Sequence, residues 1–209
     1  MANIRIKSQW FREGATKTPQ QTASAMAFIT WRVAQNMLKQ MRSASFDIEI
    51  GPQYFAFTHE VLVFLIQVLD RMANERMDDV LRAEFMTALV QRVAEVLQEN
   101  EDGLMGVPPA GQASHYDQFI DLFNALADHY ADFGFDAQQG PDFAFVRYLG
   151  HRIEALMPQK DQRWVVDQIM ASEVPDALDM LKRSMQGVLS TEPRPARATR
   201  AAHGVASGD

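Results

Sequence analysis

The sequence predicts an all-α protein, a single-domain helical bundle of six or seven helices. Apolar residues recur at the three- and four-residue spacing of amphipathic helices through most of residues 19–189. Helix-start signals precede these segments, and stretches rich in glycine and proline separate them. The alternation of apolar and polar residues that marks a strand occurs once, and it predicts one short β-hairpin near residues 45–57.

The composition excludes several classes of protein. The chain has 209 residues, of which 47% are hydrophobic and 22% charged, as in a soluble globular domain. It has no cysteine, which excludes disulfides, thiolate zinc sites, iron–sulfur clusters and cysteine nucleophiles. The N-terminus lacks the apolar core of a secretory signal, and the strongest apolar stretch falls far short of the roughly 20 residues of a membrane span. We expect a cytoplasmic protein without membrane contact.

Formal charge divides the chain into three parts. Residues 1–18 form a basic N-terminal arm of charge +3, and residues 190–209 form a basic Pro/Ala/Arg tail of charge +1. The total of −7 then leaves −11 for the helical bundle domain, residues 19–189. The tail has too few large apolar residues to fold and is predicted to be disordered. An acidic domain argues against nucleic acid as the partner, because phosphate contacts need clustered lysine and arginine.

The first helix should begin at Pro19. Thr18 supplies the N-cap, and Gln21, three residues later, completes a capping box. The apolar face of this helix is wide, so more than half of it should be buried. Its central residues are Met26, Ile29, Val33, Met37 and Met41.

The segment after the first helix predicts the hairpin. The alternating apolar residues of its first strand are Phe46, Ile48 and Ile50. Gly51-Pro52 would turn the chain, and an aromatic run at residues 54–57 would form the second strand. Thr58 would then cap a second helix that is almost entirely apolar over residues 61–69, which is typical of a central helix.

Five more helices follow in the prediction. The pattern breaks near residues 74–79, and the third helix should end near Asn100, before a glycine- and proline-rich loop over residues 101–113. Ser114 and Asp117 open the fourth helix, whose apolar face is the clearest in the chain. The last three helices are expected to start at Pro141, Asp161 and Pro175.

Motifs for nucleotide binding and catalysis are missing from the sequence. It has no glycine-rich phosphate loop and no nucleophile elbow. A di-iron bundle requires Glu-x-x-His on two helices, whereas this chain has only a reversed pair, His151 and Glu154, and a second, unrelated cluster around His129. We therefore expect no metal and no cofactor, and the sequence favours a non-enzymatic protein.

A site inside the bundle is the alternative hypothesis, because a small-ligand-binding protein or an enzyme can lack a linear motif. Three side chains are candidates for lining such a pocket: Tyr54, His59 and His129. His59 would lie beside Glu60 in the first turn of the second helix. An acid–base role there requires a carboxyl group whose pKa is shifted by burial in a cleft.

The strongest functional signal is electrostatic. Between Arg92 and Arg147 the sequence has ten acidic residues and neither lysine nor arginine. Four aspartates of the fourth helix are spaced 4, 7 and 4 residues apart, which places them on one face: Asp117, Asp121, Asp128 and Asp132. We call them the acidic stripe. Because like charges at this spacing repel, we predict that the stripe binds a basic segment of another protein, as in an adaptor, chaperone or assembly factor. A homo-oligomer is also compatible with the sequence.

Overall fold

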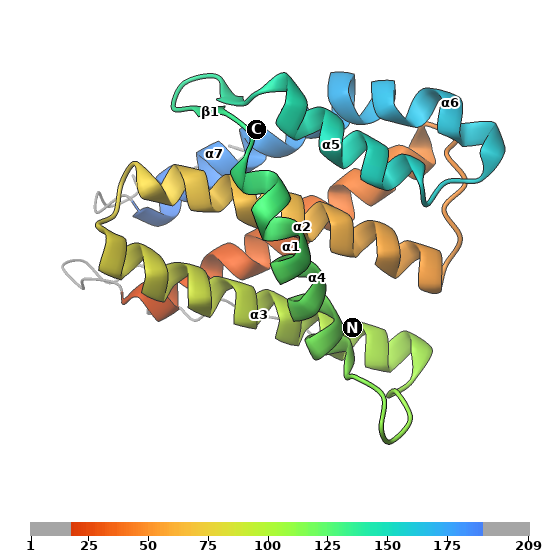
Figure 1. Ribbon diagram of the computed structural model, residues 1–209, viewed down its shortest axis with the longest axis horizontal. Coiled ribbons are helices and arrows are strands. Elements are labelled where there is room, and N and C mark those ends of the chain that lie inside the picture. Colours follow the sequence, from red (N-terminus) through yellow and green to blue (C-terminus); the bar gives the residue numbers. More distant parts are fainter. Residues whose placement is uncertain (1–17, 190–209) are drawn as a thin grey trace, which may run out of the picture. The chain divides into compact units, whose positions relative to one another are not determined.

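Residues 18–189 are described by a computed structural model, and the predicted disordered tail and the predicted basic arm up to residue 17 lie outside these residues. The helices are α1 (Pro19–Ser43), α2 (Pro52–Asn74), α3 (Asp79–Met105), α4 (His115–Ala131), α5 (Phe143–Glu154), α6 (Gln159–Gln168) and α7 (Val174–Leu189). A single π-helical turn, η2 (Ile169–Glu173), joins α6 to α7 without a break. The all-α prediction is confirmed, since helices dominate this part of the chain (Figure 1).

Helix α2 forms the centre of the core. Every residue from Val61 to Leu69 is buried, as expected for a helix that is apolar on all sides. Helices α1, α3, α4 and α5 all contact α2. The central helix predicted from the apolar run is therefore confirmed.

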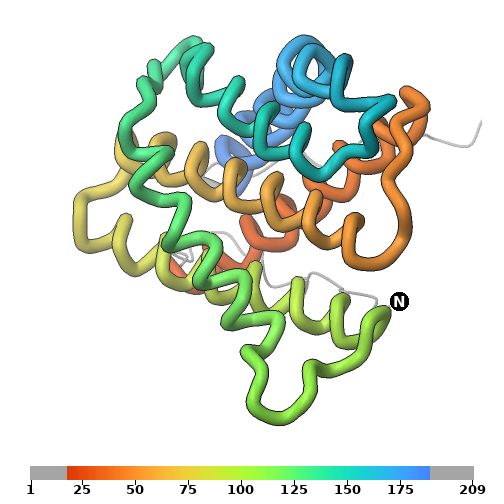
Figure 2. Tube along the Cα trace, turned by 45° about the vertical axis from the view of Figure 1, so that its right-hand side comes forward, coloured from red at the N-terminus to blue at the C-terminus, as the bar shows by residue number. Residues whose placement is uncertain are grey.

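The remaining helices cover α2 from opposite sides. Helix α4 crosses in front of α2 and α3, whereas α1 and α7 lie behind α2 in the same view (Figure 1). A view turned by 45° keeps α4 in front of α2 and the blue α7 behind it (Figure 2). Helices α1 and α7 contact each other, and so do α3 and α4. The outer faces of α4 and of the α1–α7 pair therefore belong to different sides of this unit.

Two predicted helix starts are confirmed in atomic detail. The Gln21 amide donates to Thr18 Oγ1 at 3.2 Å, and the Thr18 amide donates to Gln21 Oε1 at 3.1 Å, which completes the capping box. At α4 the Asp117 amide donates to Ser114 Oγ at 3.0 Å. Both caps satisfy amides that have no partner within their own helix.

The hairpin predicted near residues 45–57 is wrong in position. Helix α2 begins at Pro52, six residues before the predicted cap at Thr58, and takes up the whole second strand of the prediction. Among residues 18–189 the only strand pair is β1 (Phe135–Asp136) with β2 (Gly140–Pro141), an antiparallel hairpin between α4 and α5.

The residues on both sides of Gly51 explain why residues 45–57 do not form a hairpin. Proline fits the first position of a helix, and Gly51 before it adopts φ 123°, a conformation that other residues avoid. The extended residues before it find side-chain partners instead of a second strand. The Arg42 guanidinium donates to the Ile48 carbonyl at 2.7 Å, and the Asp47 amide donates to Asp161 Oδ2 at 2.8 Å.

Several helix ends differ from the prediction by a few residues. Helix α3 continues past Asn100 to Met105, and the loop is correspondingly shorter. Helix α5 starts at Phe143 with Asp142 as its N-cap, because Pro141 belongs to β2. The predicted break before α3 is confirmed, with Asp78 as the N-cap.

Candidate functional site

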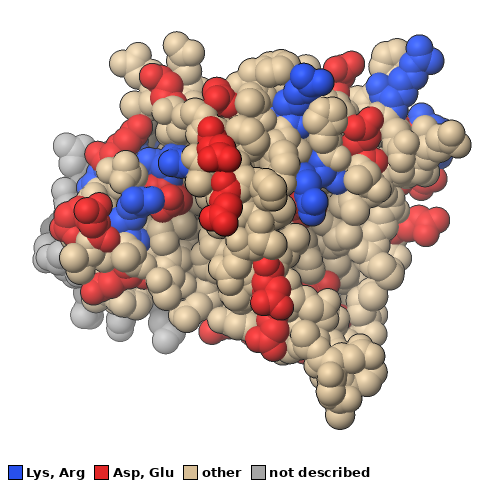
Figure 3. Space-filling model, in the orientation of Figure 1, with Lys and Arg blue, Asp and Glu red and all other residues tan. Residues whose placement is uncertain are grey.

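The acidic stripe lies on the outer face of α4. All four of its aspartates are exposed, and the exposed Asn124 fills the place between Asp121 and Asp128. Asp132 directly follows the last helical residue. In the space-filling view, acidic side chains follow the course of α4 across this face, and no lysine or arginine lies among them (Figure 3).

The opposite face of α4 anchors the helix. Phe119, Leu126 and Tyr130 are buried, and α4 packs against α3 and α2. The Tyr130 ring lies 5.0 Å from that of Phe145 on α5 and 6.3 Å from that of Phe64 on α2. The aromatic residues are thus used in the core, and the aspartates are left on the outside.

No cation among residues 18–189 forms an ion pair with the stripe. The Asp117 carboxylate accepts a hydrogen bond of 2.7 Å from the Ser114 hydroxyl. Arg71 of α2 reaches the end of α4, but its guanidinium donates to the carbonyls of Tyr130 and Ala131, both at 3.2 Å. This arginine therefore caps the C-terminal end of α4 rather than neutralising an aspartate.

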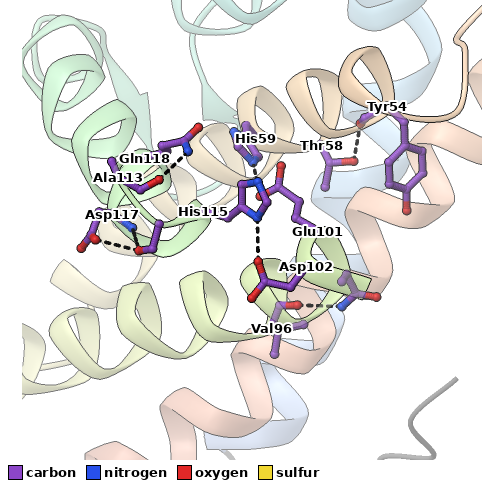
Figure 4. Close-up of polar contacts among 12 residues, drawn as sticks. Tyr54, Thr58, His59, Val96, Glu101, Asp102, Ala113, His115, Asp117 and Gln118 are labelled. Atoms are coloured by element: carbon purple, nitrogen blue, oxygen red, sulfur yellow. Dashed lines mark hydrogen bonds and ion pairs between the residues drawn. The ribbon is translucent and has the colours of Figure 1, made fainter. Parts of the chain in front are cut away.

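Two histidine–carboxylate pairs lie near the N-terminal end of α4. His115, the first residue of α4, places Nδ1 2.9 Å from Asp102 Oδ1 near the end of α3. The adjacent Glu101 lies 3.2 Å from Nε2 of His59 on α2. Figure 4 shows the two pairs side by side. They join three helices at the point where the stripe begins, so they fix its position.

Within the described part of the chain, no group of three or more histidine or acidic side chains is arranged to hold a metal ion. Each histidine instead has its own carboxylate, and Glu101 is buried. The geometry is that of two separate hydrogen-bonded pairs.

The three side chains predicted to line a common pocket have different neighbours. The Tyr54 hydroxyl donates to Gln35 Oε1 on α1 at 2.5 Å, and burial raises the pKa of Tyr54. His59 pairs with Glu101, and the exposed His129 stacks on Tyr148 at 5.7 Å between ring centroids. The structure does not bring these three residues together.

An ion pair between the buried Glu60 of α2 and the partly exposed Arg152 of α5 is not predicted from the sequence. Glu60 is 5% exposed, and Arg152 donates to both of its oxygens, from Nε at 3.0 Å and from Nη2 at 2.5 Å. The hydrogen bond to Glu60 raises the pKa of Arg152. Tyr130 is fully buried, and its hydroxyl has no partner among the described residues; burial, together with the negative charge of Glu60, raises its pKa. Glu60 and Arg152 are 92 residues apart in the sequence, and no local sequence pattern links them.

Comparisons with protein-family models, with curated proteins and with solved structures find no match to this chain. None of the helices in residues 18–189 has the length and hydropathy of a membrane span.

Proposed function

We propose that this protein is a non-enzymatic interaction module that binds a basic segment of another protein along the outer face of α4. Four exposed carboxylates in a row, without a cation to neutralise them among residues 18–189, carry this proposal. Fixed and unneutralised charge of this kind is available to a partner without first breaking an internal ion pair.

The length of the acidic stripe sets the length of the partner segment that would match it. From Asp117 to Asp132 the stripe spans 15 residues, about 22 Å at the rise of an α-helix. A basic helix, or an extended segment with several lysines or arginines over that length, would match it. The negative potential of the row increases the rate of encounter with such a segment, and salt weakens this effect.

A pocket inside the bundle receives less support. The side chains predicted to line it have separate neighbours, and the two hollows described below are open and lie on the surface of α1. Neither hollow, as lined by residues 18–189, encloses a ligand site that contains His59 or His129.

The test removes the charge of the stripe without changing its shape. The variant replaces all four aspartates of the stripe by asparagine. The probe is a fluorescently labelled 20-residue peptide with lysine or arginine at every third or fourth position. We expect the variant to bind this peptide at least tenfold more weakly at low salt, mainly through a slower association rate. The wild-type protein should lose affinity steeply as salt is added.

A matched control separates the stripe from net charge. It removes four exposed carboxylates that form no ion pair among residues 18–189 and lie outside α4: Glu49→Gln, Glu75→Gln, Glu84→Gln and Asp167→Asn. This control should retain most of the binding. Equal binding by the wild type and the stripe variant would show that the stripe is only a solvated face.

A further inference from the structure

Helices α1 and α7 form an open groove on the side of the unit away from α4. A hollow of about 500 Å³ has three cations in its walls, Arg32 and Lys39 from α1 and Arg183 from α7. Three apolar side chains line the same hollow: Ile29, Val33 and Met180. A second hollow of about 420 Å³ continues along α1 as far as Arg42. None of the described residues that line either hollow is acidic.

The positive charges of the three cations are available to a ligand. None of them forms an ion pair with a residue in the range 18–189. The Arg32 guanidinium lies 5.8 Å from the centre of the Phe28 ring, and Arg183 donates to the carbonyl of Asp179 on its own helix. Neither contact neutralises the positive charge of the arginine, and both arginines line the groove. The hollow is therefore locally positive in a chain whose net charge is −7.

A buried donor without a partner lies in the same place. Gln35 borders both hollows, and its Oε1 accepts the hydrogen bond from the Tyr54 hydroxyl. Its Nε2 is buried and has no partner among the described residues. A buried amide donor left in this state costs about 1–3 kcal/mol, so an acceptor group on a ligand would relieve it.

We propose that this groove binds an acidic peptide segment that carries an apolar side chain. Carboxylates of the segment would pair with Arg32, Lys39 and Arg183, as in the recognition of acidic motifs by arginine clusters. A backbone carbonyl would accept from Gln35 Nε2, and the apolar side chain would pack on Ile29, Val33 and Met180.

The spacing of the cations favours a chain-like ligand over a single small anion. Arg32 and Lys39 are seven residues apart on α1, about 10 Å along the helix, and Arg42 extends the row by one more turn. One phosphate could not reach all of them, whereas an extended peptide could. The chain's own ends do not suit the groove, because residues 1–18 and 190–209 both carry net positive charge. This site is separate from the acidic stripe and does not depend on the function proposed for it.

The experiment measures the binding of a defined probe by fluorescence anisotropy at low salt. The probe is a labelled eight-residue peptide of glutamate and aspartate with one central leucine. The full chain carrying Lys39→Gln and Arg183→Gln should bind it at least tenfold more weakly than the wild type. The control, Arg76→Gln with Arg163→Gln, removes two exposed cations that form no ion pair with a described residue and lie outside the groove, and it should bind within twofold of the wild type.

A second variant tests the buried donor. Gln35→Glu keeps an oxygen that can accept from Tyr54, but it replaces the donor by a second oxygen and adds a negative charge beside the cations of the groove. For both reasons the affinity should fall by tenfold or more, while the circular-dichroism melt shows a folded protein. A probe with serine in place of leucine should bind several-fold more weakly, because the apolar contact is lost.

Other results would overturn the proposal. Equal losses in the groove variant and its control would mean that net charge alone attracts the probe. Displacement of the probe by an equimolar amount of inorganic pyrophosphate would identify a site for small anions. Sedimentation at several concentrations tests for self-association of the wild type. If the wild type self-associates and the Lys39→Gln, Arg183→Gln variant does not, while that variant binds the probe as well as the wild type does, the occupant of the groove is a second copy of this chain.

Discussion

Helices α2 and α4 both carry carboxylates, but only those of α2 are neutralised within residues 18–189. On α2, Glu60 is paired with Arg152, and Asp70 accepts from Nε and Nη2 of Arg82 at 2.8 and 2.6 Å. The four aspartates of α4 have no such partner. Each carboxylate of α2 forms an ion pair with an arginine of another helix. The aspartates of the acidic stripe form no ion pair with a described residue, so their charge is available to an outside partner.

The largest expected effect comes from removing the arginine that pairs with the buried Glu60 of α2. Arg152→Met leaves Glu60 buried and without a cation, which should lower the free energy of unfolding by about 3 kcal/mol. Urea denaturation at pH 7 measures this loss. The double variant Glu60→Gln with Arg152→Met should recover more than half of it, because no charge is then left buried. An unchanged midpoint for Arg152→Met would contradict a structural role for the pair.

The second pair of α2 should be weaker. The two arginines are similarly exposed, but the Asp70 side chain is 22% exposed and that of Glu60 only 6%, so water stabilises an unpaired Asp70 more readily. A double-mutant cycle with Asp70→Asn and Arg82→Gln should give a coupling energy of about 1 kcal/mol. A coupling as large as that between Glu60 and Arg152 would show that burial does not decide the difference between the two pairs.

Glu173 in the π-turn is a buried carboxyl group without an arginine partner. It predicts that the stability of the protein falls as the pH rises. Burial raises the pKa of Glu173, the hydrogen bond from Gln168 opposes the rise, and the charge of Asp176 adds to it. The folded state therefore binds this proton more tightly than the unfolded state. The contribution of Glu173 to stability falls as the pH rises above the ordinary glutamate value of about 4.3 and through the raised pKa.

Glu173→Gln removes this cost. Its amide would supply a donor in place of Oε2, which is buried and has no partner among the described residues. At pH 8 the variant should be more stable by about 1 kcal/mol, a rise in the melting temperature of about 2–4 °C. The gain should shrink as the pH falls and disappear at about pH 3, well below the unfolded value, where Glu173 is protonated in both states. A gain that is equal at both pH values would show that the effect is not electrostatic.

The smallest expected effect on stability comes from the stripe of α4. Changing its four aspartates to asparagine relieves repulsion within two i,i+4 pairs, which should stabilise the fold by at most about 0.5 kcal/mol. Asp117 near the positive end of the helix dipole loses a favourable interaction, and Asp132 near the negative end loses an unfavourable one, so these two changes offset each other. Thermal melts at low salt should resolve the difference. A loss above 1 kcal/mol would mean that the aspartates serve the fold.

Features that depend on neighbouring residues could be predicted from the sequence. The caps at Thr18 and Ser114 are fixed by side chains within three residues of the helix start. The placement of the stripe follows from the helical repeat alone. The burial of residues 61–69 likewise follows from a helix without a polar face.

Features that depend on tertiary contacts could not be predicted. The alternation at residues 46–50 is typical of a strand, but its backbone finds partners in Arg42 and in Asp161, which is more than 110 residues away. The groove combines residues near 30 with residues near 180, and nothing local pairs α1 with α7. The pocket hypothesis for Tyr54, His59 and His129 was based on residue type, which does not specify which side chains meet.

The π-turn between α6 and α7 also has an evolutionary consequence. A π-turn holds more residues than a normal turn, so it can be regarded as a one-residue insertion into a continuous helix. Because the π-turn already absorbs the extra residue, deleting the exposed Ala171 would restore regular α-helix and leave α7 in nearly the same orientation relative to α6. Leu181 and Met185 would stay in the core, and Arg183 would stay at the groove. Descendants of this chain should therefore tolerate the loss of one residue at 169–173, as well as length changes in the exposed loop between α3 and α4, whereas a further inserted residue at 169–173 that continued as regular helix would turn the apolar face of α7 by about 100° away from the core.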